Sequence, residues 1–309
     1  MPTLDRITIY PVKSLDGLDV AEAMVQPSGG LANDRRWQLV DMEGRVLNAK
    51  RSPLLHAIRA AFDLADPVGG DRGGVAPGGA NEVSLAIDPA AVAARAIPGI
   101  ERLADLGPGR FPLVPGPEGP CGWLSEAFDT GVLLLERIDG GFPDDREASG
   151  PTVISTATLE EVARWLRVDA AECRRRFRAN LEIDACDAFW EDTLASPARP
   201  ELRPSLFDLP ADLPADPYAD LPPPEPREFS IGDARFKATN VCRRCVVPSR
   251  DSRTGAVTAQ FRDVFEAWRG RRMRDDVDAS NWNHVYRLAI NTRGVSPGLV
   301  TTGTNVVGH

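Results

Sequence analysis

Residues 237–260 read KATNVCRRCVVPSRDSRTGAVTAQ and contain two cysteines at C-x-x-C spacing with two arginines between them. The thiols belong to Cys242 and Cys245, and the guanidinium groups belong to Arg243 and Arg244. A neighbouring positive charge favours the thiolate form of cysteine, which attacks electrophiles and binds metals. Arginine also holds phosphate through two parallel hydrogen bonds. The stretch could therefore bind a soft metal and an anionic group together.

The composition is that of an ordinary globular protein. The chain has 309 residues, of which 42% are hydrophobic and 26% are charged, as is typical of folded domains. Its formal net charge of -9 argues against a general nucleic-acid binder, which would need a basic surface. No apolar run approaches the ~20 residues of a membrane span, and residues 1–14 lack the pattern of a secretory signal. The five cysteines are too sparse for a disulfide scaffold, so we expect a reducing, cytoplasmic location.

Short apolar runs between turn residues predict a mainly β fold with short helices. Candidate strands in the first half lie at residues 7–12, 20–25, 36–40 and 83–87, around Leu103, and at 110–114. Several short strands separated by turn signals suggest a meander or a barrel. Residues 66–80 are rich in glycine and proline, and we expect them to form an exposed loop.

The second half mixes short helices with strands. We predict a helix at 120–128, a strand at 132–138, a polar loop at 140–150, strands at 181–184 and 229–233, a helix beginning at 264–268, and a strand-like tail at 285–307. Thr158, with Glu161 three residues later, predicts the N-cap of an amphipathic helix. Residues 196–226 hold ten prolines among 31 residues, a composition that excludes a helix interior or a central strand.

Three alternatives for the C-x-x-C pair stay open beside a reactive thiolate. A structural zinc site needs four ligands, and the chain offers three histidines and no second C-x-x-C. A redox pair of the thioredoxin type usually begins a helix after a strand, whereas Val246, Val247 and Pro248 favour a strand and a turn. Two buried and inert thiols are the third alternative, because an unpaired cysteine is commonly a small core residue.

Other polar residues stand where apolar strands begin or end. Lys13 and Ser14 follow an apolar run, and Arg178 shortly precedes an apolar strand. A guanidinium at the start of a packed element can hold an anion. The arginine runs at 174–178 and 269–274 are, by contrast, of a kind that is usually solvated. The sequence holds no P-loop, no dinucleotide fingerprint after a strand and no G-x-S-x-G motif.

Five segments, in family order, resemble the MOSC superfamily, which is named for the C-terminal part of molybdenum cofactor sulfurase. They read IYPVKS at 9–14, GLANDRRW at 30–37, ISTATL at 154–159, FRAN at 177–180, and CRRC at 242–245 with DSRTG at 251–255. Ala179 and Ser252 stand where the family usually has proline. The combination covers most of the chain and is far more specific than any one segment.

The resemblance implies two β-barrel domains with a molybdenum cofactor (Mo-molybdopterin) between them. The N-terminal domain would span residues 1–120 and pack on a C-terminal MOSC domain at 121–309, which the proline-rich segment 196–226 interrupts. By the same transfer, Cys245 is the molybdenum ligand and the catalytic residue, in agreement with the affinity of thiolates for soft metals. The residues implied to bind the pterin and its phosphate are Lys13, Ser14, Arg35, Ser155, Thr158, Arg178, Asn180, Arg243, Arg244 and, by a looser match, Tyr286.

Within the superfamily, the chain resembles the mitochondrial amidoxime-reducing components and their bacterial counterparts. This resemblance implies a molybdenum-dependent oxidoreductase that abstracts oxygen from small N-hydroxylated compounds at the metal bound by Cys245. No cysteines remain after this motif to build an iron–sulfur cluster. We therefore expect electrons from a separate donor, a ferredoxin-like or cytochrome-b5-like protein with its reductase, and no nucleic-acid partner.

A second hypothesis is a sulfur carrier or a cofactor-handling protein in which Cys245 carries a persulfide. The pyridoxal-phosphate-dependent desulfurase portion of full sulfurases is expected to be absent, because the chain begins directly in the β domain. A third hypothesis is a non-catalytic module that stores or hands over the cofactor. Sulfur transfer to Cys245 without bound molybdenum would favour the second hypothesis, and bound cofactor without turnover would favour the third.

Overall fold

The computed structural model describes residues 1–65, 81–145, 147–198 and 225–308. The loop expected at 66–80 and most of the proline-rich segment 196–226 lie outside these residues. The described part is mainly β with short helices. The predicted fold class is therefore confirmed.

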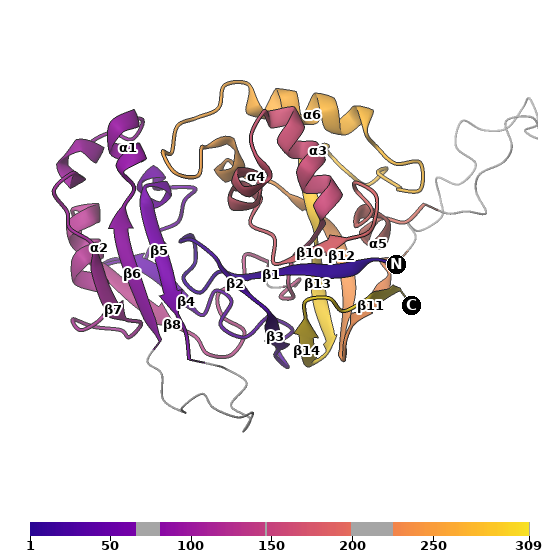
Figure 1. The fold of residues 1–309 in the computed structure, drawn as a ribbon, viewed down its shortest axis with the longest axis horizontal. Helices are drawn as coiled ribbons and strands as arrows, with labels where there is room; N and C mark the ends of the chain where they lie inside the picture. The colour runs from indigo at the N-terminus through magenta and orange to yellow at the C-terminus, as the bar shows by residue number, and fades with distance from the viewer. Residues whose placement is uncertain (66–80, 146, 199–224, 309) are drawn as a thin grey trace, which may run out of the picture.

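An eight-stranded sheet, here called the main sheet, occupies one half of the molecule and brings the two chain ends together (Figure 1). In spatial order its strands are β15 (Val306–Gly308), β11 (Glu228–Ile231), β12 (Ala234–Arg243), β13 (Arg287–Ser296), β9 (Val153–Ser155), β10 (Leu181–Asp184), β1 (Thr3–Ile9) and β2 (Leu18–Val20). Leu4, Ile7, Phe229 and Phe236 are fully buried in the core beneath it. β1 buries Leu4, Ile7 and Ile9, with a shift in pairing between Leu4 and Arg6, and a slip of the strand by one residue would expose these side chains.

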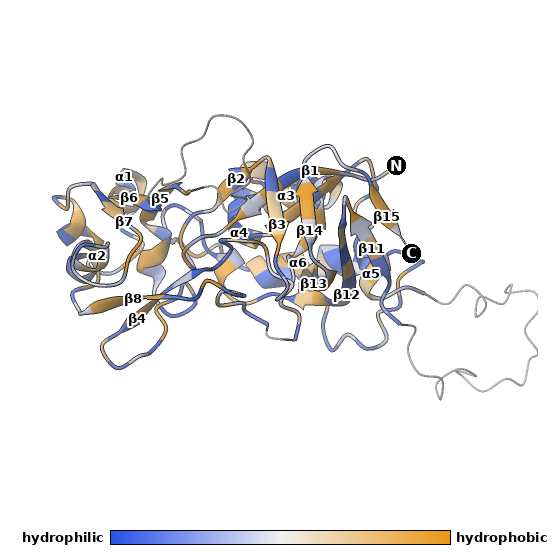
Figure 2. Cartoon of the chain, turned by 90° about the horizontal axis from the view of Figure 1, so that it is seen from below, coloured by the Kyte–Doolittle hydropathy of each residue, from blue (hydrophilic) through white to orange (hydrophobic). Residues whose placement is uncertain are grey.

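Three smaller sheets complete the β structure. They are β5 (Ile58–Asp63) with β6 (Glu82–Ile87) and β7 (Gly109–Pro112), β4 (Trp37–Asp41) with β8 (Val132–Glu136), and β3 (Glu22–Val25) with β14 (Gly298–Thr301). Apolar residues dominate β14 (Figure 2). The first two sheets share a second core with Trp37, Ile58 and Leu134 and form the other half of the molecule with α1 (Pro89–Ala94) and α2 (Cys121–Phe128) (Figure 1).

Three helices, α3 (Thr156–Leu166), α4 (Ala170–Phe177) and α6 (Phe261–Arg271), lie on one side of the main sheet (Figure 1). The short helix α5 (Asp192–Ala195) packs Leu194 and Ala195 into the core of the main sheet. Phe177 of α4 and Phe265 of α6 pack with ring centroids 5.9 Å apart, and Phe265 lies edge-on to Tyr286 at 5.2 Å. This aromatic cluster, whose burial stabilises the fold, joins the helices to the strand region that carries the cysteines. Each helix in the described ranges is too short or too polar to cross a lipid bilayer.

The N-cap of helix α3 lies three residues before the predicted one. Ser155 is the N-cap, with an extended backbone and a hydroxyl that accepts a hydrogen bond from the Thr158 N–H at 3.1 Å. Thr158 lies in the first turn, where its hydroxyl is hydrogen-bonded to that of Ser155 at 2.7 Å. The prediction of Thr158 as N-cap was wrong because both hydroxyl residues suit a cap, and only the backbone conformation distinguishes them.

Other departures from the predictions concern short elements. The strand expected around Leu103 is the 3₁₀ helix η2 (Ile100–Leu103), which buries both of its end residues. The strand and turn expected after Cys245 is a second short 3₁₀ helix, η4 (Val247–Ser249). A third, η1 (Pro53–His56), precedes β5. Helices α1 and α4 and strand β5 were not predicted, because short elements carry too little periodicity to be read locally.

Pairing between distant segments links the two ends of the chain. β1 pairs with β10, β3 pairs with β14, and β4 pairs with β8. These long-range pairs place residues 9–14 and 30–37 close to segments from the later part of the chain. The domain boundary expected at residue 120 stays a prediction.

Candidate functional site

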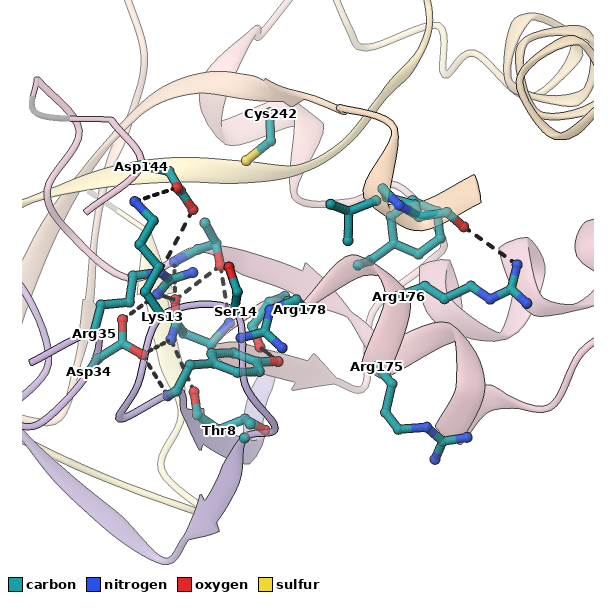
Figure 3. Close-up of a pocket in the computed structure, with 18 of the residues that line it drawn as sticks. Thr8, Lys13, Ser14, Asp34, Arg35, Asp144, Arg175, Arg176, Arg178 and Cys242 are labelled. Carbon is teal, nitrogen blue, oxygen red and sulfur yellow. Dashed lines mark hydrogen bonds and ion pairs between the residues drawn. The ribbon is translucent and has the colours of Figure 1, made fainter. Parts of the chain in front are cut away.

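A cavity of about 1080 Å³ is lined by residues from both halves of the molecule (Figure 3). Twelve lysine and arginine side chains and six aspartate and glutamate side chains line it, although the whole chain has a net charge of -9. Positive charge concentrated in a concave site attracts anions and raises their local concentration. The cavity therefore suits a ligand that carries negative charge.

Two of the sequence motifs meet at one wall of this cavity. The N–H of Arg35 donates to the carbonyl of Tyr10 at 2.8 Å, and the N–H of Lys13 donates to the carbonyl of Trp37 at 2.8 Å. Ser14 and Arg35 have φ angles of 72° and 50°, values that non-glycine residues adopt rarely and that are enriched at functional sites. Lys13, Ser14 and Arg35 all line the cavity.

Asn180 anchors this wall through its amide group. Its Nδ2 donates to the Thr8 carbonyl at 3.0 Å and to Asp34 Oδ1 at 3.1 Å, and its Oδ1 accepts from the Thr152 N–H at 3.1 Å. Asp34 in turn forms an ion pair with Arg35. Asn180 is 2% exposed and lines the cavity, but these hydrogen bonds already occupy its amide. Its geometry is that of a residue that positions the cations beside it.

Arg178 and Arg35 flank the ring of Tyr10. The Arg178 guanidinium carbon lies 4.0 Å from the ring centroid, and that of Arg35 lies 5.5 Å from it. Burial raises the pKa of Tyr10 to about 12, so the phenol is neutral. Burial also lowers the pKa of Arg178, and within the described ranges no carboxylate lies within ion-pair distance of its guanidinium. Arg178 is therefore a cation at the cavity wall that has no ion-pair partner among the described residues, although Asp16 and Asp144 act on it at longer range.

Asp144, which the sequence did not suggest, lies over the same cations. Its Oδ1 is 2.8 Å from Lys13 Nζ, and its Oδ2 is 3.8 Å from Arg35 Nε (Figure 3). Lys13 Nζ also donates to the carbonyl of Phe142 at 3.2 Å. A loop acid thus contacts two of the residues expected to bind an anion.

The two cysteines of the C-x-x-C motif occupy different environments. Cys242, near the end of β12, is 4% exposed, and its Sγ donates to Asn291 Oδ1 at 2.8 Å. Burial raises the pKa of Cys242 to about 11, so the expectation that the flanking arginines favour a thiolate was wrong for this residue. Cys245 lies beyond the strand end, is half-buried, and lines the cavity. Both thiols are free, as are the other three in the chain.

Three arginines surround this motif, one of which the sequence did not suggest. Arg244 lies over the Phe177 ring at 5.3 Å, and its buried Nε has no hydrogen-bond partner among the described residues. Arg243 is exposed at the cavity and pairs across the sheet with Arg287. Arg287 is 4% exposed, and burial followed by the charge of Arg243 lowers its pKa. The position of Arg287 depends on the register between β12 and β13, and no local sequence motif predicts that register.

His56 also lines the cavity and was not singled out from the sequence. It is 7% exposed, and its Nε2 has no hydrogen-bond partner in the part of the chain described. Burial, followed by the charges of Arg250 and Arg178, lowers the pKa of His56 to about 4. The imidazole is therefore neutral near pH 7.

The structure brings eight of the eleven expected site residues into one cavity lining. These are Lys13, Ser14, Arg35, Arg178, Asn180, Arg243, Arg244 and Cys245. Ser155 and Thr158 lie behind it, where the Thr158 hydroxyl donates to Glu191 Oε2 at 3.2 Å. Tyr286 belongs to the aromatic cluster, and its hydroxyl donates to the Cys245 carbonyl at 3.0 Å. These three residues lie outside the cavity lining, and their part in binding stays a prediction.

The donor set fits a metal that a cofactor carries. Among the described residues, no group of three or more histidine, cysteine, aspartate or glutamate side chains could hold a metal ion. A soft metal bound at Cys245 would therefore need its remaining ligands from outside the protein, as a pterin-bound molybdenum would supply. The unpartnered Arg244 Nε and the excess of cations suit the anionic part of such a group.

Comparison with known proteins gives relatives of two kinds. Molybdenum cofactor sulfurase of Drosophila yakuba is 25% identical over 284 residues, which are 88% of this chain and 31% of that protein. Mitochondrial amidoxime-reducing component 1 of Homo sapiens is 23% identical over 280 residues, which are 83% of this chain and 68% of that protein. Molybdenum cofactor sulfurase of Oryza sativa subsp. japonica is 43% identical over 61 residues, 20% of this chain and 7% of that protein.

The chain thus spans about a third of the length of the first sulfurases that it matches. Among solved structures, the YUAD protein from Bacillus subtilis aligns with 100% of this chain and 96% of that chain at 9% identity and a TM-score of 0.36, too low to argue from. Residues 1–94 match the profile of the family described as MOSC N-terminal beta barrel domain. The predicted resemblance is confirmed: residues 1–94 match the MOSC N-terminal beta barrel domain family, and the chain is similar over most of its length to molybdenum cofactor sulfurases and to an amidoxime-reducing component.

Proposed function

We propose that this protein binds the molybdenum cofactor in the cationic cavity and reduces N-hydroxylated compounds with electrons from a separate donor protein. The observation that carries the proposal is the convergence of Cys245 with Lys13, Arg35, Arg178 and Arg244 on one cavity. These residues come from distant parts of the chain, and no common structural element requires them to meet. The similarity to the human amidoxime-reducing component supports reduction as the reaction.

Different residues would bind the metal and the anionic part of the cofactor. Cys245 would hold the metal through its thiolate, and Tyr286 would fix the backbone of Cys245 through the 3.0 Å hydrogen bond to its carbonyl. When bound, the cofactor supplies the two-electron oxygen-transfer chemistry that side chains lack. Arg178 and Arg244 would hold the anionic part of the cofactor through charge-assisted hydrogen bonds.

The remaining expected residues take smaller parts in this proposal. Lys13, Ser14, Arg35 and Arg243 would contribute donors at the wall, and Asn180 would keep Asp34 and Arg35 in place. Ser155 and Thr158 would act through α3, where Ser155 is the N-cap and Thr158 lies in the first turn. A ferredoxin-like or cytochrome-b5-like protein with its reductase would supply the electrons.

The test compares the two cysteines in a turnover assay. The protein is expressed in a host that makes the cofactor and is given a chemically reduced viologen dye and an aromatic amidoxime, with the amidine product measured by chromatography. Cys245→Ser should lose at least about 100-fold in rate, because a ligand to the metal is lost. Cys242→Ser is the matched control, and it should keep most of the activity because Cys242 is buried and protonated. Equal losses in both variants would contradict the assignment.

The sulfurase relatives favour a second candidate, a sulfur carrier or cofactor-handling protein that uses Cys245. The half-buried, free thiol of Cys245 in a cationic cavity would also suit a persulfide. Incubation with a cysteine desulfurase and cysteine, followed by mass spectrometry of the peptide that contains Cys245, distinguishes the two. A persulfide that forms on protein free of molybdenum, together with no amidoxime reduction by loaded protein, would favour sulfur handling. Loaded protein that neither accepts sulfur nor turns over would favour a binding module.

A further inference from the structure

The loop between β8 and β9 carries an acid that lies on the cavity's cations. Asp144 contacts Lys13 at 2.8 Å and Arg35 at 3.8 Å through its two carboxylate oxygens (Figure 3). Its side chain is 73% exposed, whereas those of Lys13 and Arg35 are 17% and 15% exposed. The carboxylate therefore reaches from solvent onto two cations that are largely enclosed.

The loop is anchored on both sides of Asp144. The Phe142 N–H donates to the Arg35 carbonyl at 2.9 Å, and the Ser149 hydroxyl donates to the Ser28 carbonyl at 2.8 Å. Gly141 permits the close approach at the first anchor, since a Cβ there would lie 2.7 Å from the Asp34 carbonyl oxygen. These anchors hold the acid near the cations without burying it.

Unlike Asp144, the other acids near the same cations accept hydrogen bonds that tie them to the fold. Asp34 is tied to the fold through Tyr10 N–H at 2.8 Å and Asn180 Nδ2 at 3.1 Å. Asp145, the next residue in the loop, accepts the N–H groups of Glu147 and Ala148 at 2.9 and 3.3 Å. The described contacts of the Asp144 carboxylate are with the two cations alone.

We propose that Asp144 is an internal competitor for the anion-binding site: its carboxylate occupies Lys13 and Arg35 until the phosphate group of a ligand displaces it. A tethered competitor lowers the apparent affinity of a ligand by the fraction of molecules in which the site is free. The carboxylate is exposed and carries a single charge, whereas a phosphate carries up to two charges and more acceptor oxygens, so a phosphate can displace it. The inference rests on the anion site of the proposed function.

The experiment measures the affinity of inorganic phosphate for the full chain by calorimetry at constant ionic strength. The protein is expressed in a host that lacks the molybdenum cofactor, so that no bound cofactor fills the site. Asp144→Asn should bind phosphate roughly three- to tenfold more tightly than the wild type, the range expected from releasing one or two ion pairs in which the carboxylate is exposed. An unchanged or weaker affinity, or no phosphate binding to Asp144→Asn, would overturn the proposal.

Two further variants separate competition from simple charge removal. Asp145→Asn removes the same charge from the same loop and should change phosphate affinity by less than about twofold, because the hydrogen bonds of Asp145 with described residues are to the backbone. In a Lys13→Ala background, the gain from Asp144→Asn should shrink, since one of the two cations under competition is gone. Equal gains from both loop acids would show a long-range charge effect and contradict competition.

The outcome is separable from that of the proposed function. If Asp144→Asn binds phosphate more tightly but the protein never carries molybdenum, the result would support Asp144 as a competitor and contradict binding of the molybdenum cofactor. A molybdenum-loaded, active protein whose phosphate affinity is insensitive to position 144 would do the reverse.

Discussion

Arg176 and Arg178 stand two residues apart in one sequence run but face opposite electrostatic settings. Arg176 is 5% exposed, and its Nε lies 2.6 Å from a carboxylate oxygen of Glu172. Arg178 stacks on Tyr10 and, among the residues that the structure describes, has no carboxylate at ion-pair distance. A paired arginine is committed to the fold, whereas an unpaired one is available to a ligand. The ion-pair partners of each arginine in a run must therefore be known before a function is assigned to it.

The largest effect expected from this comparison is on stability. Arg176→Ala should lower the free energy of unfolding by about 3–5 kcal/mol, because it leaves Glu172 buried without this partner. Urea denaturation followed by circular dichroism measures the change. Arg175→Ala is the matched control: it also contacts Glu172, at 2.9 Å, but its side chain is 40% exposed. The control should lose less than about 1 kcal/mol, and similar losses in both variants would contradict the division.

The next effect concerns His56, a buried side chain whose pKa is lowered in part by the charge of Arg178. Burial first, then Arg250 and Arg178, lower this pKa from 6.5 to about 4. Because folding lowers the pKa, the stability contributed by neutral His56 is present above about pH 6.5 and is lost as the pH falls toward about 4. Over that window the wild type should lose about 3 kcal/mol more in unfolding free energy than His56→Gln. Urea titrations at several pH values measure both, and parallel curves would contradict the lowered pKa.

The smallest effect is on ligand affinity rather than on folding. Arg178→Ala should weaken the binding of inorganic phosphate about tenfold, the value of one charge-assisted hydrogen bond. Its unfolding free energy should fall by only about 1 kcal/mol, since mainly the contact with Tyr10 is lost. Calorimetry and urea denaturation give the two numbers. A stability loss as large as that of Arg176→Ala, with phosphate affinity unchanged, would place Arg178 among the structural arginines.

Local sequence predicted the features that depend on neighbouring residues. Apolar alternation and turn residues gave most strands, and the motifs at 9–14, 30–37, 177–180 and 242–245 marked side chains that share one cavity. Those motifs are informative because unusual backbone and charged side chains occur together in them, as at Ser14 and Arg35.

The rest depends on which distant segments come together. Arg287 reaches the cavity because β13 pairs with β12, and Asp144 reaches it because the Phe142 N–H bonds to the Arg35 carbonyl. Neither residue has a local pattern that marks it. The opposite environments of Cys242 and Cys245 also follow from strand position, since the first lies within β12 and the second beyond its end. Charge near a thiol in the sequence is a poor guide when burial dominates its pKa.

Molybdenum content per protein molecule tests the central claim most directly. The wild type, Cys245→Ser and Cys242→Ser are each expressed in a host that makes the molybdenum cofactor and in one that cannot, and the metals are measured by mass spectrometry. We predict near-stoichiometric molybdenum in the wild type and in Cys242→Ser from the first host, a marked fall in Cys245→Ser, and none from the second host. Zinc in both hosts, or no metal in either, would contradict a molybdenum site at Cys245.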